Sequence, residues 1–253
     1  MLKNTRQRLQ NSELYKNILL LISGNGLAQV IPLLVYPVIT RLYTPEEFGI
    51  LAFLFSIHII ILTLSTARLD VAIILPKKDT QAESLFNSGL SIALIISILI
   101  PLVALLMDSF GDINETYAKL GNWVYLLSLT VFFTAFSLLA RGWCTRKKYF
   151  KTIIFYTLSL QIVTSSLKLV FGLFHLRQGL VAAFVIAQVL SGFLLFLNLR
   201  DRKKSTPVIR FFRKPDFRII SEYANFPKFN LPHALINTIS SNLPVLMLTF
   251  YFS

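Results

Sequence analysis

Residues 85–107 read LFNSGLSIALIISILIPLVALLM, a run that contains no charged side chain. An α-helix rises about 1.5 Å per residue, so about 20 such residues cross a hydrocarbon core about 30 Å thick. Similar runs recur along the chain, at roughly residues 17–40, 48–69, 121–140, 152–174, 178–199 and 233–253. They are too long for membrane strands and do not alternate in polarity. The sequence therefore predicts an all-α fold, a polytopic membrane helix bundle of about seven transmembrane helices.

The composition agrees with lipid surroundings. Of the 253 residues, 55% are hydrophobic and only 15% are charged, whereas a soluble domain carries about 25% charged residues. The mean hydropathy is +0.65. These values exclude a soluble enzyme, a disordered tail and a secreted disulfide scaffold. A single cysteine, Cys144, excludes an internal disulfide and a cysteine-based metal cluster.

The basic residues divide unequally between alternate connections. Of 25 Lys and Arg, 21 lie in residues 1–16, 70–84, 141–151 and 200–232 or, for Arg68, beside them. Three lie in residues 41–47, 108–120 and 175–177, and Lys168 lies inside a span. Basic residues near span ends stay on the cytoplasmic side. The division predicts a cytoplasmic N-terminus. It also explains the net charge of +13 as a topology signal, and the basic connections are expected to attract anionic lipids rather than nucleic acid.

The connections offer no room for catalysis. The longest outward connection, residues 108–120, is short, and no paired acids, HExxH motif or Walker loop occur in the sequence. We therefore expect neither an enzyme nor a cofactor or metal. The inward stretch 200–232 is strongly basic and is typical of a solvated linker that contacts lipid head groups. The last apolar run reaches Ser253 without a polar tail, so we expect the N-terminal part of a longer protein or a truncated product.

Polar side chains form stripes at helical spacing in three spans. The stripes comprise Asn25, Gln29, Pro32, Tyr36 and Thr40; Thr130, Thr134, Ser137 and Arg141; and Thr157, Gln161, Thr164, Ser165 and Lys168. Singly, such residues are usually contacts between helices, but three stripes together favour a hydrated cavity. Lys168 fits two interpretations, a cavity cation or a side chain that snorkels to the interface. His58 has few polar neighbours at helical spacing and is interpreted as a packing residue.

Three blocks carry a resemblance to a known family. They are TRLYTPEEFGILAFLF at 40–55, RLDVAIILPK at 68–77 and NFPKFNLPHALINTISSNLPVLMLT at 225–249. In these blocks and their separation, the chain resembles the Wzx-like oligosaccharide flippases of bacterial surface-polysaccharide synthesis. That group belongs to the multidrug/oligosaccharidyl-lipid/polysaccharide exporter superfamily. The resemblance covers essentially the whole chain, and the first block is its most specific part.

The resemblance implies two six-helix lobes around a V-shaped cavity. Residues 1–199 would form the N-lobe, 200–232 the inter-lobe linker and 233–253 the start of the C-lobe. The implied cargo is an undecaprenyl-diphosphate-linked oligosaccharide that crosses the bacterial inner membrane for surface polysaccharide or O-antigen (lipopolysaccharide) synthesis. Anionic lipids and polysaccharide assembly proteins are the further partners to be expected.

The candidate binding residues come from the stripes and the span ends. A lipid diphosphate in the membrane needs cations in a hydrated cavity, because its charge alone is costly to bury. The candidates for the diphosphate are Arg41, Arg68, Arg141 and Lys168. The candidates for polar contacts are Asn25, Gln29, Tyr36 and Gln161.

Three alternatives stay open. A drug or cation exporter of the same superfamily would need acids within the spans, but the 12 acids lie in connections or at span ends. A membrane enzyme of polysaccharide assembly would need a longer outward connection. The chain could also be an inactive half-transporter or an assembly partner.

Overall fold

The computed structural model describes residues 2–109, 123–176, 178–201 and 217–252, with side chains placed from residue 19 to 248 apart from 107–122, 177 and 201–217. The elements are α1 (Leu2–Leu42), α2 (Pro45–Ser65), α3 (Leu69–Ala72), α4 (Asp79–Ser109), α6 (Trp123–Arg146), α7 (Phe150–Leu173), α8 (Gly179–Asp201), α9 (Phe217–Glu222), the π-helical turn η2 (Phe226–Asn230) and α10 (Leu231–Phe252). No strand occurs in these ranges, which confirms the predicted all-α fold.

Six of the described helices are long and apolar enough to cross a membrane. They cover Leu19–Leu42, Pro45–Ser65, Asp79–Leu106, Trp123–Arg146, Phe150–Leu173 and Gly179–Arg200. They confirm the first six predicted spans. The seventh predicted span, residues 233–253, falls on the 22-residue helix α10, which is not among the six. Asn237, Asn242 and other polar side chains interrupt its apolar sequence.

Local chemistry sets the boundaries of α2. Thr44 caps the helix: its Oγ1 accepts a hydrogen bond from the Glu47 N–H (3.3 Å), and the Thr44 N–H donates to Glu47 Oε2 (2.9 Å). This capping box, with Pro45 in the first turn, starts the helix three residues before the predicted position 48. At the other end, Ala67 and Arg68 adopt the left-handed conformation, with φ of 46° and 59°, and turn the chain into α3.

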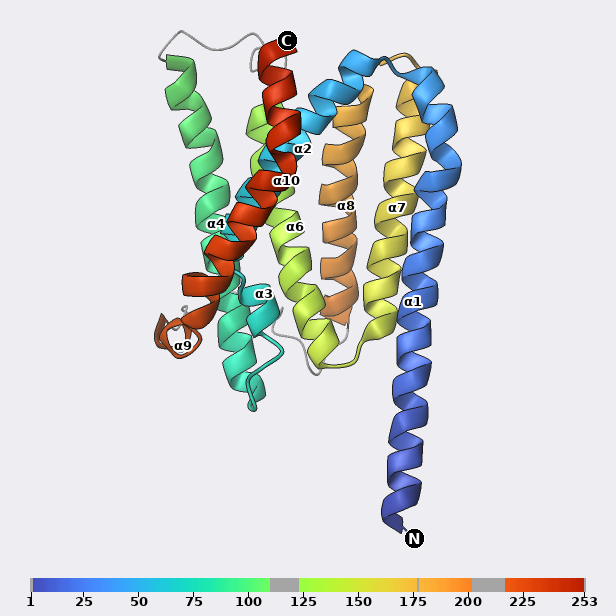
Figure 1. The fold of residues 1–253 in the computed structure, drawn as a ribbon, viewed down its shortest axis with the longest axis vertical. Helices are drawn as coiled ribbons and strands as arrows, with labels where there is room; N and C mark the ends of the chain where they lie inside the picture. The colour runs from blue at the N-terminus through green and yellow to red at the C-terminus, as the bar shows by residue number, and fades with distance from the viewer. Residues whose placement is uncertain (1, 110–122, 177, 202–216, 253) are drawn as a thin grey trace.

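The helices form one bundle with two distinct ends (Figure 1). One end, here called the α3 end, holds the N-terminus, α3, α9 and the connection between α6 and α7. The opposite end, the Tyr43 end, holds the connections after α1 and α7 and the C-terminus of α10. The described parts of the two sets of connections that the basic residues distinguish therefore lie at opposite ends of the bundle. Of the stretch 200–232, residues 202–216 lie outside the described part, and the remainder is largely helical.

Helices α6 and α8 form the interior. Half of the most apolar window of each is buried, compared with 11% for α1 and 17% for α7. Trp143, Phe136 and Leu139 of α6 pack with Leu69 and Leu195 in the largest apolar cluster. Two side-chain hydrogen bonds also hold α8 to α6: Thr134 Oγ1 donates to Gln188 Oε1 of α8 (3.2 Å), and Trp123 Nε1 donates to Oε1 of Gln178, the residue just before α8. The interior is thus held by packing and by hydrogen bonds between helices.

Candidate functional site

The four candidate cations form two pairs at opposite ends of the bundle. Arg41 lies in the last turn of α1, and Lys168 lies near the end of α7, both at the Tyr43 end. Arg68 precedes α3, and Arg141 lies near the end of α6, both at the α3 end. The structure therefore does not gather the four side chains into one cluster.

Tyr43 organises the end that carries Arg41 and Lys168. Its hydroxyl donates to the Lys168 backbone carbonyl at 2.7 Å and so joins α1 to α7. A Cβ at Gly172 would lie 2.9 Å from the Tyr43 ring, and one at Gly179 would lie 3.0 Å from its hydroxyl. Burial raises the pKa of Tyr43 to about 12, and the negative charge of Glu47 adds to the effect. The phenol therefore stays protonated and keeps donating at physiological pH. The Lys168 side chain is half-buried.

The connector of residues 66–78, between α2 and α4, holds the second pair close to α6. Arg68 is half-buried, and its Nε atom is buried without a hydrogen-bond partner among the described residues. The Oδ1 atom of Asp70 is likewise buried without such a partner. A Cβ at Gly142 would lie only 2.4 Å from the Asp70 carbonyl oxygen. The connector backbone thus packs directly on α6 at Gly142, the residue that follows the exposed Arg141. Arg68, Asp70 and Arg141 bring three charges to this end.

The polar candidates lie along α1 and α7. Gly24 and the fully buried Ala28 mark the packed side of α1, since a Cβ at Gly24 would lie 2.7 Å from Ile154 of α7. Gln29 and Tyr36 of the predicted stripe are exposed instead. Asn25 on α1 and Gln161 on α7 are half-buried.

The predicted polar face of the fourth span is largely a packing surface. Thr130 is buried, and its hydroxyl contacts His58 Nδ1 at 3.2 Å and the Leu127 carbonyl at 2.9 Å. Thr134 bonds Gln188, and the buried Ser137 donates to a carbonyl of its own helix. These three side chains make contacts within the bundle. His58 is buried, which agrees with its interpretation as a packing residue, but it also has a defined polar partner.

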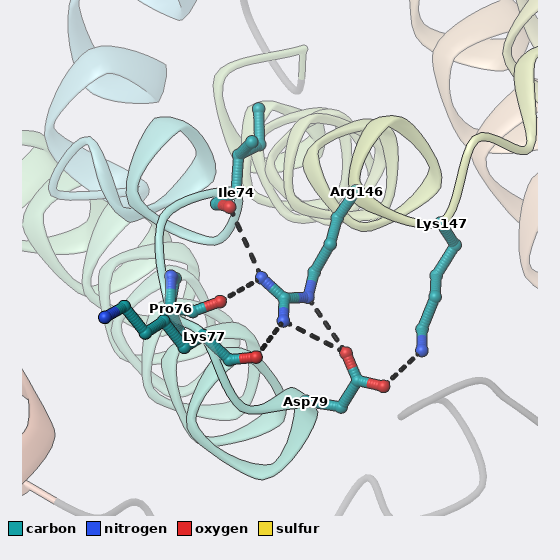
Figure 2. A network of polar contacts seen from close by, with 6 residues as sticks. All are labelled: Ile74, Pro76, Lys77, Asp79, Arg146 and Lys147. Carbon is teal, nitrogen blue, oxygen red and sulfur yellow. Dashed lines mark hydrogen bonds and ion pairs between the residues drawn. The ribbon is translucent and has the colours of Figure 1, made fainter. Parts of the chain in front are cut away.

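A polar network that spacing did not indicate fixes the connector to α6. In Figure 2 the Arg146 guanidinium donates to the carbonyls of Ile74 (3.3 Å), Pro76 and Lys77 (3.5 Å) and pairs with Asp79 (3.1 Å). Lys147 binds the other oxygen of the same carboxylate. Arg146 and Asp79 are 67 residues apart, so no local pattern in the sequence pointed to this pair.

Comparisons with known proteins address the family and the fold of the chain. The sequence profile of a family described as polysaccharide biosynthesis protein matches residues 14–253. Among solved structures, an outward-facing multidrug resistance MATE family transporter of the MOP superfamily superposes with a TM-score of 0.52 at 15% identity. The superposition covers 92% of this chain and 52% of that transporter, so the chain spans about half its length.

No curated protein sequence matches the chain. The superposition, at its low identity, establishes a shared fold. The profile covers nearly all of the sequence, including the six spans and both ends that carry the candidate cations. The chain belongs to the polysaccharide biosynthesis protein family.

Proposed function

We propose that the chain is the N-lobe of a flippase that moves undecaprenyl-diphosphate-linked oligosaccharides across the bacterial inner membrane for surface polysaccharide or O-antigen synthesis. The family match over residues 14–253 carries the proposal. Polysaccharide units are strongly polar, and a hydrocarbon core does not admit them without a protein path. A bundle of apolar helices with a transporter fold supplies such a path.

The arrangement of the cations suggests how the cargo moves. The α3 end would face the cytoplasm, as the basic connections predict, and there Arg68 and Arg141 would receive the diphosphate. Arg41 and Lys168 would hold it at the outer end. Each pair offers positive charge where a lipid head group enters or leaves, and the prenyl tail would stay in the bilayer.

Polar side chains lie between the two pairs. Asn25 is next to Gly24, which meets Ile154 near the start of α7, whereas Tyr36 lies closer to the Tyr43 end. From Asn25 to Arg41 the helix rises about 24 Å at 1.5 Å per residue, most of the thickness of a bilayer core. Gln29 and Gln161 lie within this length and would hydrogen-bond the sugars. A second lobe facing these side chains would complete the cavity, and the two lobes would rock between states.

A drug or cation exporter is the second candidate, because the MATE transporter shares the fold. Cation binding within the membrane calls for acidic side chains inside the spans. The described carboxylates of α2 and α4 are Glu46, Glu47, Asp79 and Glu83, all close to the start of their helices. This placement favours an anionic cargo.

The test is deletion of the gene followed by complementation from its own locus, so that every residue encoded with this chain is present. We expect surface polymer to disappear and lipid-linked oligosaccharide to accumulate on the cytoplasmic leaflet. Unchanged polymer and no accumulation would contradict the proposal.

Substitutions then test the candidate residues. Arg68→Ala and Lys168→Ala should lower surface polymer at unchanged protein level, whereas Lys168→Arg should largely preserve it. Lys78→Ala is the matched control, because Lys78 is an exposed basic residue at the α3 end outside the candidate set. Normal polymer with Lys168→Ala would return this residue to snorkelling at the interface.

A further inference from the structure

An ionisable side chain, His58, lies in the interior of the bundle between α2, α6 and α8. It is 2% exposed. Its ring stacks on Phe55, with 6.5 Å between centroids, and meets Phe184 edge-on at 5.2 Å. An aromatic hydrocarbon side chain would fill such a site without any polar group to bury. An ionisable residue inside a membrane span is costly, and this cost points to a function.

The hydrogen bonds of Thr130 favour one tautomer of this histidine. The Thr130 hydroxyl has one hydrogen, and it donates that hydrogen to the Leu127 carbonyl at 2.9 Å. With that hydrogen engaged, the same oxygen is left to accept from His58 Nδ1, at 3.2 Å, which favours a proton on Nδ1. Nδ1 then carries the proton of the neutral ring, and Nε2 keeps a free lone pair. None of the hydrogen bonds found among the described residues involves Nε2.

Charged groups lie far from the ring along every helix packed on α2. Their described titratable side chains are Glu46 and Glu47 on α2, Asp79 and Glu83 on α4, Tyr125, Arg141, Cys144 and Arg146 on α6, Arg200 on α8 and His233 on α10. Glu47 is eleven residues before His58, about 16 Å along the helix. No described carboxylate is thus placed to compensate a positive charge on the ring. A charged imidazole is therefore incompatible with the present packing.

We propose that His58 is a proton-binding site through which this protein couples a rearrangement of α2 to the proton gradient, an inference that rests on the proposed transport function. A proton from the aqueous phase bonds to the Nε2 lone pair and gives an imidazolium, and no other bond changes. The charged ring favours a conformer in which α2 separates from α8 and water reaches Nε2. Release of the proton restores the present packing. Two conformers with different proton affinity are the condition for such coupling.

A contact of α2 with the last described helix extends this rearrangement. Thr63, five residues after His58, contacts Thr238 of α10 through their hydroxyl oxygens at 3.4 Å. A movement of α2 driven by His58 therefore reaches α10, which lies on the outer side of the bundle in Figure 1.

The first experiment measures protonation directly by nitrogen NMR of the full protein in lipid vesicles, labelled with ¹⁵N-histidine. The sequence has only three histidines, so His58→Phe assigns the signal, and His58→Gln serves if the Phe variant does not fold. We expect a neutral ring with the proton on Nδ1 that converts reversibly to imidazolium when the pH is lowered. Thr130→Val should remove the preference for the Nδ1 tautomer. A ring that stays neutral at every pH at which the protein stays folded would overturn the proposal.

The second experiment measures coupling by hydrogen–deuterium exchange of α2 and α8 in the same vesicles, corrected for the intrinsic pH dependence. Above the midpoint, the open population should rise by up to about tenfold for each pH unit lowered. This rise should vanish in His58→Phe and persist in His233→Gln, whose histidine is exposed. Titration of His58 without opening would also overturn the proposal. Neither readout needs a substrate, so failure of the proposed function, judged by surface polymer, is scored separately.

Discussion

Replacing Gly142 by alanine should destabilise the protein and displace the connector. The added Cβ would lie 2.4 Å from the Asp70 carbonyl oxygen, whereas atoms in good contact lie about 3.5 Å apart. The connector must therefore move by about 1 Å. Overpacking of this kind costs about 1–3 kcal/mol. The obstacle here is backbone and not a flexible side chain, so the upper end of that range applies.

Helix propensity offsets part of this cost. Alanine is better than glycine in a helix by about 1 kcal/mol, so the net loss for Gly142→Ala is about 2 kcal/mol. A loss of this size lowers the melting temperature by about 4–8 °C in a chain of about this length. The same displacement shifts Arg68, so surface polymer should fall as well.

Gly26→Ala is the matched control. A Cβ at Gly26 would meet nothing within 4 Å, and the position is exposed on α1. This variant keeps the propensity gain without the clash, so it should melt at the wild-type temperature or a few degrees above. Thermal unfolding of the purified proteins in one detergent, followed by size-exclusion chromatography, compares them. Equal melting temperatures for Gly142→Ala and Gly26→Ala would refute the close approach of the connector to α6.

Three further predictions address the ends of the bundle. Arg146→Ala should expose residues 74–79 to limited proteolysis and lower the melting temperature, because one guanidinium binds three carbonyls and a carboxylate there. An unchanged cleavage pattern would contradict this prediction. The pKa of Tyr43 is about 12 in the folded protein and about 10 in the unfolded chain. Its contribution to stability is therefore full below pH 10 and is lost as the pH rises from 10 to 12. In alkaline unfolding, the free energy of unfolding of Tyr43→Phe should fall less over this range than that of the wild type. The native Cys144 is buried and cannot report the topology, so it is replaced by alanine. In this background and in cells with a permeabilised outer membrane, an impermeant maleimide should label Leu176→Cys but not Lys78→Cys. The reverse labelling pattern would mean that the topology is inverted.

The apolar runs were sufficient to predict the bundle, because burial of backbone polar groups in lipid leaves few alternatives to helices. Their ends were harder to place. Glu46 and Glu47 looked like part of a connection, but with Thr44 they form the cap and first turn of α2. In α10, polar residues lower the mean hydropathy, so the sequence alone provided a weak basis for assigning a membrane span there.

Helical spacing placed polar residues on one side of a helix but did not identify what lies opposite. Thr130 and Thr134 have the spacing of a cavity lining, yet His58 and Gln188 take up their hydroxyl groups. The partners come from other helices, and a single sequence does not record which helices touch. The division of the cations was accessible, since alternate connections already assigned Arg41 to the opposite side from Arg141.

The side-chain contacts between helices differ between the centre of the bundle and α10. Side chains of α6 form hydrogen bonds with Gln188 of α8 and with Gln178 just before it, and half of the most apolar window of each helix is buried. Helix α10 has no buried residue among those described; it packs along α2, and the side-chain contact found between the two helices is the long one between Thr63 and Thr238. It follows the π-helical turn η2, which contains Pro227, and π-helical turns and prolines are common points of bending. A buried centre formed by α6 and α8, with α10 attached beyond the turn η2, would suit the rocking between two states that we propose for this protein.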